Sequence, residues 1–74
     1  MRGARVIKSE QIGERIAEAI RQSGLTQTAI AKELNISQST IAHYIKGDIL
    51  PALDTFANLC KLLDVDTNYI LCQQ

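Results

Sequence analysis

A run of hydrogen-bonding side chains between Ser37 and Lys46 is the part of this 74-residue chain best suited to recognise another molecule. The polar members of the run are Ser37, Gln38, Ser39, Thr40, His43 and Lys46. None of them is acidic, and each can donate a hydrogen bond. A Gln amide can bond bidentately to adenine, and a Ser hydroxyl can contact several bases. The run therefore indicates either a helix face that reads DNA or a polar helix face that is simply solvated.

Two short helices are predicted to position these side chains. Apolar or small residues recur at helical spacing in two groups, which are Ile30, Ala31 and Leu34, and then Ile41, Tyr44 and Ile45. Between the groups, Asn35 tolerates the left-handed backbone conformation, and Ser37 can cap the start of a new helix. Ala31 is small enough for close packing of one helix across the other. The stretch therefore predicts a helix-turn-helix.

The chain resembles the Cro/C1-type, or XRE, family of phage-repressor-like DNA-binding domains, and the resemblance extends over about residues 9 to 71. The matching positions are Leu25-Thr26-Gln27, Ile30-Ala31, Leu34-Asn35-Ile36-Ser37, Ile41, Tyr44, Gly47, Pro51-Ala52-Leu53, Leu59 to Val65 and Tyr69-Ile70-Leu71. Asn35 replaces the usual turn Gly, Ala52 replaces a capping Ser or Thr, and Asp64 replaces a Gly that ends a helix. The resemblance implies an all-α, compact five-helix repressor-like domain, with the helix-turn-helix formed by the second and third helices.

The resemblance also implies sequence-specific binding to double-stranded DNA by a transcriptional regulator, most often a repressor, with the third helix in the major groove. We expect Gln38, Ser39 and His43 to read bases. The family's Gln that braces the DNA backbone corresponds to Gln27. The residues expected to hold the backbone are Thr26, Gln27, Ser37, Thr40 and Lys46. A homodimer on a palindromic operator is expected, with its contact near Tyr69 and Leu71.

Helix boundaries follow from caps and apolar spacing. Helices are predicted over about 9–22, 27–34 and 37–46. A fourth helix is predicted to begin between Ala52 and Asp54 and to end near Leu63, and a last short helix runs through Tyr69, Ile70 and Leu71. The expected caps are Ser9, Thr26, Ser37 and Asp66, with Gly24 and Gly47 at helix ends. The predicted core contains Ile30, Leu34, Ile41, Tyr44, Leu59 and Leu63. Either Ile49 or Leu50 should fold back onto the core or contact a partner.

The formal charge is zero, with eight basic and eight acidic side chains, so composition alone does not indicate nucleic acid. Residues 1–8 carry Arg2, Arg5 and Lys8 with no acid. We interpret 1–8 as a flexible basic arm, which either grips DNA or is a plain disordered tail. Residues 72–74 are interpreted as a C-terminal tail. The acidic residues expected to turn away from DNA are Asp48, Asp54, Asp64 and Asp66.

Several functional classes are disfavoured. No apolar run is long enough to span a membrane, and no signal peptide is visible. Cys60 and Cys72 do not form a disulfide or zinc pattern, and Cys60 is expected to be a buried thiol. A cytoplasmic protein is therefore expected. With His43 as the single histidine, we predict no enzyme activity, metal or cofactor.

Two alternatives remain open on the sequence. The domain could be an antitoxin-like or other protein-interaction module that binds DNA mainly in complex with a protein partner. It could also be the N-terminal part of a longer repressor whose C-terminal domain is missing, because the residues after Leu71 form no linker.

Overall fold

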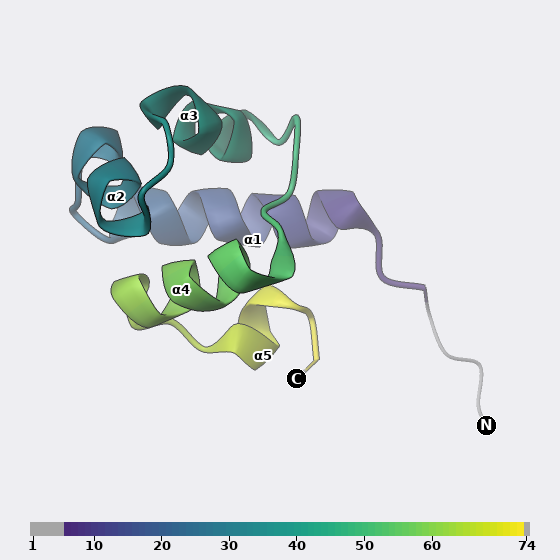
Figure 1. Ribbon diagram of the computed structural model, residues 1–74. Coiled ribbons are helices and arrows are strands. Elements are labelled where there is room, and N and C mark those ends of the chain that lie inside the picture. Colours follow the sequence, from purple (N-terminus) through teal and green to yellow (C-terminus); the bar gives the residue numbers. More distant parts are fainter. Residues whose placement is uncertain (1–5, 74) are drawn as a thin grey trace.

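The computed structural model describes residues 6–73. Within this range the chain forms five α-helices joined by short turns and loops, and no strand (Figure 1). They are α1 (Ser9–Gln22), α2 (Gln27–Leu34), α3 (Gln38–Lys46), α4 (Leu53–Leu63) and α5 (Thr67–Ile70). The predicted all-α, five-helix fold is confirmed. Arg2 and Arg5 of the predicted arm, and Gln74 of the predicted tail, lie outside the described residues.

Helix α1 runs across the middle of the molecule, with α3 on one side and α4 and α5 on the other (Figure 1). It packs against α3 and α5, while α2 packs against α3 and α4. Its apolar stripe supplies Ile16 and Ile20 to the core, where each is only 2% exposed. Helix α1 therefore shares one core with α3 and α5, and α3 keeps exposed the side chains of Gln38, Ser39, His43 and Lys46.

Four side chains, one from each of α2 to α5, lie at the centre of the core. They are Ile30, Ile41, Leu59 and Ile70. Of the predicted core, Tyr44 is buried with them, but Leu34 and Leu63 are only partly buried. Both partly buried residues lie in the last turn of their helices, where the chain leaves the core.

Polar caps start three of the helices as predicted. Thr26 Oγ1 accepts a hydrogen bond from Ala29 N at 3.0 Å, and Ser37 Oγ accepts one from Thr40 N at 3.2 Å. Asp66 Oδ1 accepts one from Asn68 N at 3.0 Å. These bonds satisfy backbone amides that have no partner inside the helix.

The predicted cap of α1 is wrong by one residue. The N-cap is Lys8, and Ser9 is the first helical residue. The physical reason is Gln11, whose side-chain oxygen reaches back and accepts a hydrogen bond from Lys8 N at 2.9 Å. A side chain at the third helical position can thus start a helix without a hydroxyl at the cap. Lys8 belongs to this helix start.

Four helices end in the same backbone turn, in which a residue with positive φ carries the chain back over the last helical turn. These residues are Asn35, Gly47, Asp64 and Cys72, with φ of 57°, 85°, 55° and 61°. After each, the next amide donates to the carbonyl five residues earlier, as Ile36 N does to Ala31 O at 3.0 Å. This pair of features defines a Schellman motif. Gly47 ends α3 as predicted, and the predicted left-handed Gly24 has φ 79°.

The loop between α3 and α4 only partly covers its apolar side chains. Leu50 lies over Gly13 of α1, with its Cδ2 3.7 Å from the position a Cβ would take there. Both Ile49 and Leu50 nevertheless remain exposed, and Leu53, the first residue of α4, is 86% exposed.

Within residues 6–73, no helix is long and apolar enough to cross a membrane.

Candidate nucleic-acid interface

The first turn of α3 is organised by a cluster of hydroxyl groups. Ser37 Oγ lies 3.1 Å from Ser39 Oγ and 2.8 Å from Thr40 Oγ1, in addition to accepting from the Thr40 amide. The cluster restrains these side chains before any ligand arrives. Three hydroxyl hydrogens serve two contacts between oxygens, so one hydroxyl hydrogen of the cluster remains for an outside acceptor.

Gln38 lies in the same turn but is not part of the hydroxyl cluster. Its side chain is exposed, and within residues 6–73 its amide has no hydrogen-bond partner. The amide carries two donors and one acceptor, so it can both give and accept at a single base edge. Gln38 is therefore the side chain of this turn that is most available to an external ligand.

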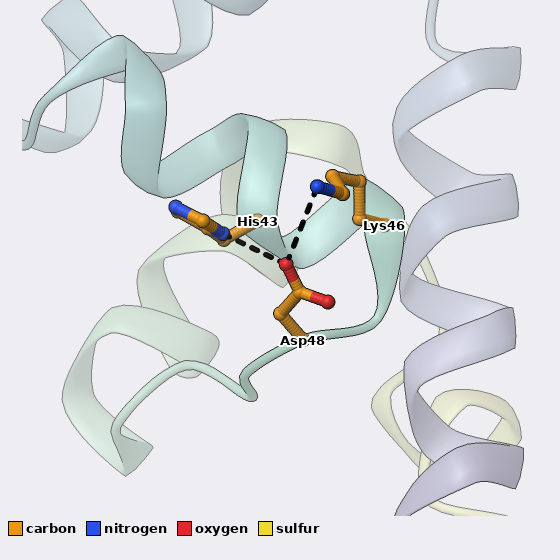
Figure 2. Close-up of polar contacts among 3 residues, drawn as sticks. All are labelled: His43, Lys46 and Asp48. Carbon is orange, nitrogen blue, oxygen red and sulfur yellow. Dashed lines mark hydrogen bonds and ion pairs between the residues drawn. The ribbon is translucent and has the colours of Figure 1, made fainter.

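A three-residue polar cluster joins the last turn of α3 to the loop that follows it, as Figure 2 shows. Asp48 Oδ2 lies 3.0 Å from His43 Nδ1 and 3.7 Å from Lys46 Nζ. All three side chains are exposed to solvent. The expectation that Asp48 turns away from this face is therefore wrong, because its carboxylate contacts two of the predicted DNA-contacting residues.

The backbone explains why Asp48 returns to α3. Gly47 donates to Tyr44 O at 3.2 Å, and Asp48 N donates to His43 O at 3.1 Å, which completes the Schellman motif. In this motif the residue after the left-handed position comes near the residue five positions earlier, commonly with an apolar contact between them. Here that pair is Asp48 and His43, so a carboxylate and an imidazole meet. The sequence contains the signal for this contact, since a histidine and an aspartate stand five residues apart on either side of Gly47.

The charge state of Asp48 follows from these contacts. The hydrogen bond from His43 lowers the pKa of the Asp48 carboxyl below its ordinary value, and the positive charge of Lys46 acts in the same direction. Asp48 is therefore ionised at neutral pH and accepts hydrogen bonds without donating them. It also offsets part of the positive charge that Lys46 would offer to a phosphate.

A second group of predicted contacts lies at the start of α2. Thr26 is exposed, and its hydroxyl accepts from the Ala29 amide while keeping its own hydrogen for an outside acceptor. Gln27 is half-buried, at the first helical position. Within residues 6–73, no hydrogen bond joins these two side chains to α3, although the two helices pack together. The structure thus presents two polar groups, one at the start of each helix.

Two packed helices joined by a tight turn, with an acid-free polar first turn on the second, define a helix-turn-helix domain. The chain belongs to the Cro/C1-type helix-turn-helix (XRE) family, since the family model described as helix-turn-helix matches residues 16–70. Searches of curated proteins and of solved structures returned no match. The family is one of DNA-binding regulatory domains, so the resemblance seen in the sequence is confirmed.

Proposed function

We propose that this protein is a sequence-specific transcriptional regulator, acting as a repressor, that places α3 in the major groove of double-stranded DNA while α2 crosses the backbone. The observation that carries the proposal is the first turn of α3. It is exposed, free of acidic residues and held in shape by the Ser37 hydroxyl cluster, and it presents the exposed Gln38 amide.

The proposed roles divide between bases and backbone. Gln38 is the leading base reader, and Ser39 and His43 read with it. Thr26, Gln27, Ser37, Thr40 and Lys46 hold phosphates, which sets the register of the domain without carrying sequence information. The start of α2 supports this division, because free amides and a partial positive charge favour a phosphate there.

A homodimer on a palindromic operator forms part of the proposal. A single module of this size buries roughly 600–1,000 Å² on DNA, which is little for firm specific binding. The proposed dimer contact involves Tyr69, which is 39% exposed, and the partly buried Leu71. Arg15 of α1 donates to Tyr69 O at 2.5 Å, and its guanidinium lies 4.3 Å from the centre of the Tyr69 ring. These contacts hold α5 against α1. Each single chain therefore already forms the surface around Tyr69 that we propose for the dimer contact.

Selection of bound duplexes from a random pool tests the proposal, because a recovered palindrome would show specificity and two-fold symmetry together. On the selected operator, Gln38→Ala should cost about 1–3 kcal/mol of binding free energy, as loss of one good bidentate base contact does. On unrelated duplexes it should cost almost nothing. The control is Gln22→Ala, the same change at an exposed position in the last turn of α1. An unchanged ratio of specific to non-specific affinity in Gln38→Ala would remove Gln38 from the reading set.

The second candidate is a protein-interaction module that binds DNA mainly in complex with a protein partner. Exposed apolar side chains favour it, because Ile49, Leu50 and Leu53 are 46%, 41% and 86% exposed within five residues of chain. Wild type with no preference for any duplex, together with tight binding of a protein partner in the absence of DNA, would establish this function in place of the first.

A further inference from the structure

We propose that Asp48 is a positioning residue that holds the His43 ring with its proton on Nδ1, so that Nε2 faces the major groove as a hydrogen-bond acceptor. His43 would then select a base carrying an exocyclic amino group, adenine or cytosine, at one position of each half-site. The inference rests on the proposed function, and it assigns a chemical preference to one of the proposed base readers.

The proton position follows from the 3.0 Å contact between His43 Nδ1 and Asp48 Oδ2. An ionised carboxylate has no hydrogen to donate, so the shared hydrogen must belong to Nδ1. In a neutral imidazole, a proton on Nδ1 leaves Nε2 with a free lone pair. Figure 2 shows the second ring nitrogen of His43 pointing away from Asp48.

The backbone makes this arrangement persistent. The Schellman motif at Gly47 brings the Asp48 backbone to His43, with Asp48 N donating to His43 O at 3.1 Å. The carboxylate therefore reaches the ring across one short, ordered turn. Lys46 Nζ, 3.7 Å from the same carboxylate oxygen, adds a second contact that keeps Asp48 on this side of α3.

An acceptor at Nε2 distinguishes bases by their major-groove edges. Adenine offers the N6 amino group and cytosine the N4 amino group, and both are donors. Guanine offers only acceptors there, and thymine offers an acceptor and a methyl group. An imidazole with its proton on Nε2 would instead donate, and it could then bond to guanine, to thymine O4 or to adenine N7 but not to the cytosine amino group. Asp48 thus determines which bases His43 accepts, and it need not contact DNA itself.

The first test reads the tautomer in the free protein. His43 is the single histidine of the chain, so a two-bond ¹H–¹⁵N spectrum has one imidazole to assign. At about pH 8, where an ordinary imidazole is neutral, wild type should show the proton on Nδ1. Asp48→Ala should move the population towards Nε2. The charge-matched control is Glu33→Ala, on the side of α2 that faces Lys61 and Leu62 of α4, and it should match wild type. A proton on Nε2 in wild type, or identical spectra for wild type and Asp48→Ala, would overturn the inference.

The second test reads the base preference by selection from random duplexes. Wild type and Glu33→Ala should enrich adenine or cytosine over guanine or thymine at one position per half-site. The expected enrichment is about fivefold, near the lower end for one well-formed base contact. Asp48→Ala and His43→Ala should lose that enrichment while the remaining positions of the operator are recovered unchanged.

The two ways of failing are distinguishable. A recovered operator whose amino-base preference survives in Asp48→Ala overturns this inference and leaves the proposed function standing. A wild type with its proton on Nδ1 that selects no sequence overturns the proposed function and the reading role of His43 together.

Discussion

Cys60 and Cys72 place the same side chain in two environments. Cys60 is 5% exposed in the core, whereas Cys72 is only partly buried in the turn after α5. Burial raises the pKa of the Cys60 thiol, and a hydrogen bond with Thr67 opposes that shift to a smaller extent. Because the thiolate is the reactive form, Cys60 should be the less reactive of the two.

We therefore expect iodoacetamide to modify Cys72 in the folded protein well before Cys60, with the modified position identified by mass spectrometry. The difference should disappear in denaturant. Stability should also fall as the pH rises through the ordinary thiol pKa of 9.0, since the unfolded state loses a proton that folded Cys60 retains. Equal rates for the two thiols in native buffer would contradict the buried position of Cys60.

Ile30 and Leu34 have the same apolar character and helical spacing in the sequence, but the structure separates them. Ile30 is fully buried, whereas Leu34 is only partly buried. Ile30→Ala should cost about 2–5 kcal/mol of unfolding free energy, as truncation of a buried Ile does. Leu34→Ala should cost less, because the Leu34 side chain buries less apolar surface on folding than the Ile30 side chain does. Urea unfolding of both variants measures the difference, and equal losses would place Leu34 in the core after all.

At the level of the elements, the helix-turn-helix depends on the left-handed residue between α2 and α3. Asn35 has φ 57°, a conformation that Asn tolerates and β-branched residues resist. Asn35→Gly should be neutral or mildly stabilising, since Gly enters this region without a side-chain clash. Asn35→Val should destabilise clearly. Thermal unfolding of the two variants provides the comparison, and equal midpoints would show that the turn does not depend on this φ.

The start of α4 is under-capped, because Ala52 has no side-chain acceptor. Its extended backbone, with φ −61° and ψ 160°, already suits a cap. Ala52→Ser should stabilise the fold by about 0.5 kcal/mol, the low end of the range for a cap. The gain is small because Asp54 Oδ1 already accepts from Thr55 N at 2.8 Å.

The background variant Asp54→Ala supplies the control for this cap. Without the Asp54 carboxylate, the Thr55 amide loses its side-chain acceptor, so the same Ala52→Ser change should gain more there. Denaturant unfolding of the wild type, the two single variants and the double variant gives the coupling between the two positions. Additive effects would mean that the new hydroxyl at position 52 and the Asp54 carboxylate do not compete for the same amide.

The helix bounds were predictable from the sequence because they depend on local signals. Apolar spacing and the caps Thr26, Ser37 and Asp66 placed α2, α3 and α5 close to their observed positions. The errors lie where a side chain reaches across a helix end. Gln11 moves the start of α1, and Asp48 returns to the end of α3. Propensity and periodicity do not encode such contacts, because these depend on the direction in which the backbone leaves the helix.

Over the whole molecule the formal charge is zero, but the basic and acidic side chains are not evenly distributed along the chain. Lys46 is a cation on α3, and its ammonium group lies 3.7 Å from the Asp48 carboxylate. Exposed pairs of this kind contribute little to stability, but this one reduces the charge available to a phosphate. The partial neutralisation of Lys46 was not predictable from composition, because it depends on the turn at Gly47.

The salt dependence of DNA binding should therefore be shallow. The slope of log affinity against log salt is about −0.9 for each phosphate neutralised on duplex DNA. Lys46→Ala should reduce the slope by about 0.9 per bound domain, and it should weaken specific and unrelated duplexes alike. The matched control is Lys61→Ala, which removes the same charge from the side of α4 that faces Glu33, and its slope should equal that of wild type. Deletion of residues 1–5 removes Arg2 and Arg5 but keeps Lys8, which caps α1. A steep slope that survives Lys46→Ala and collapses on this deletion would assign the electrostatic contact to the N-terminal arm instead of α3.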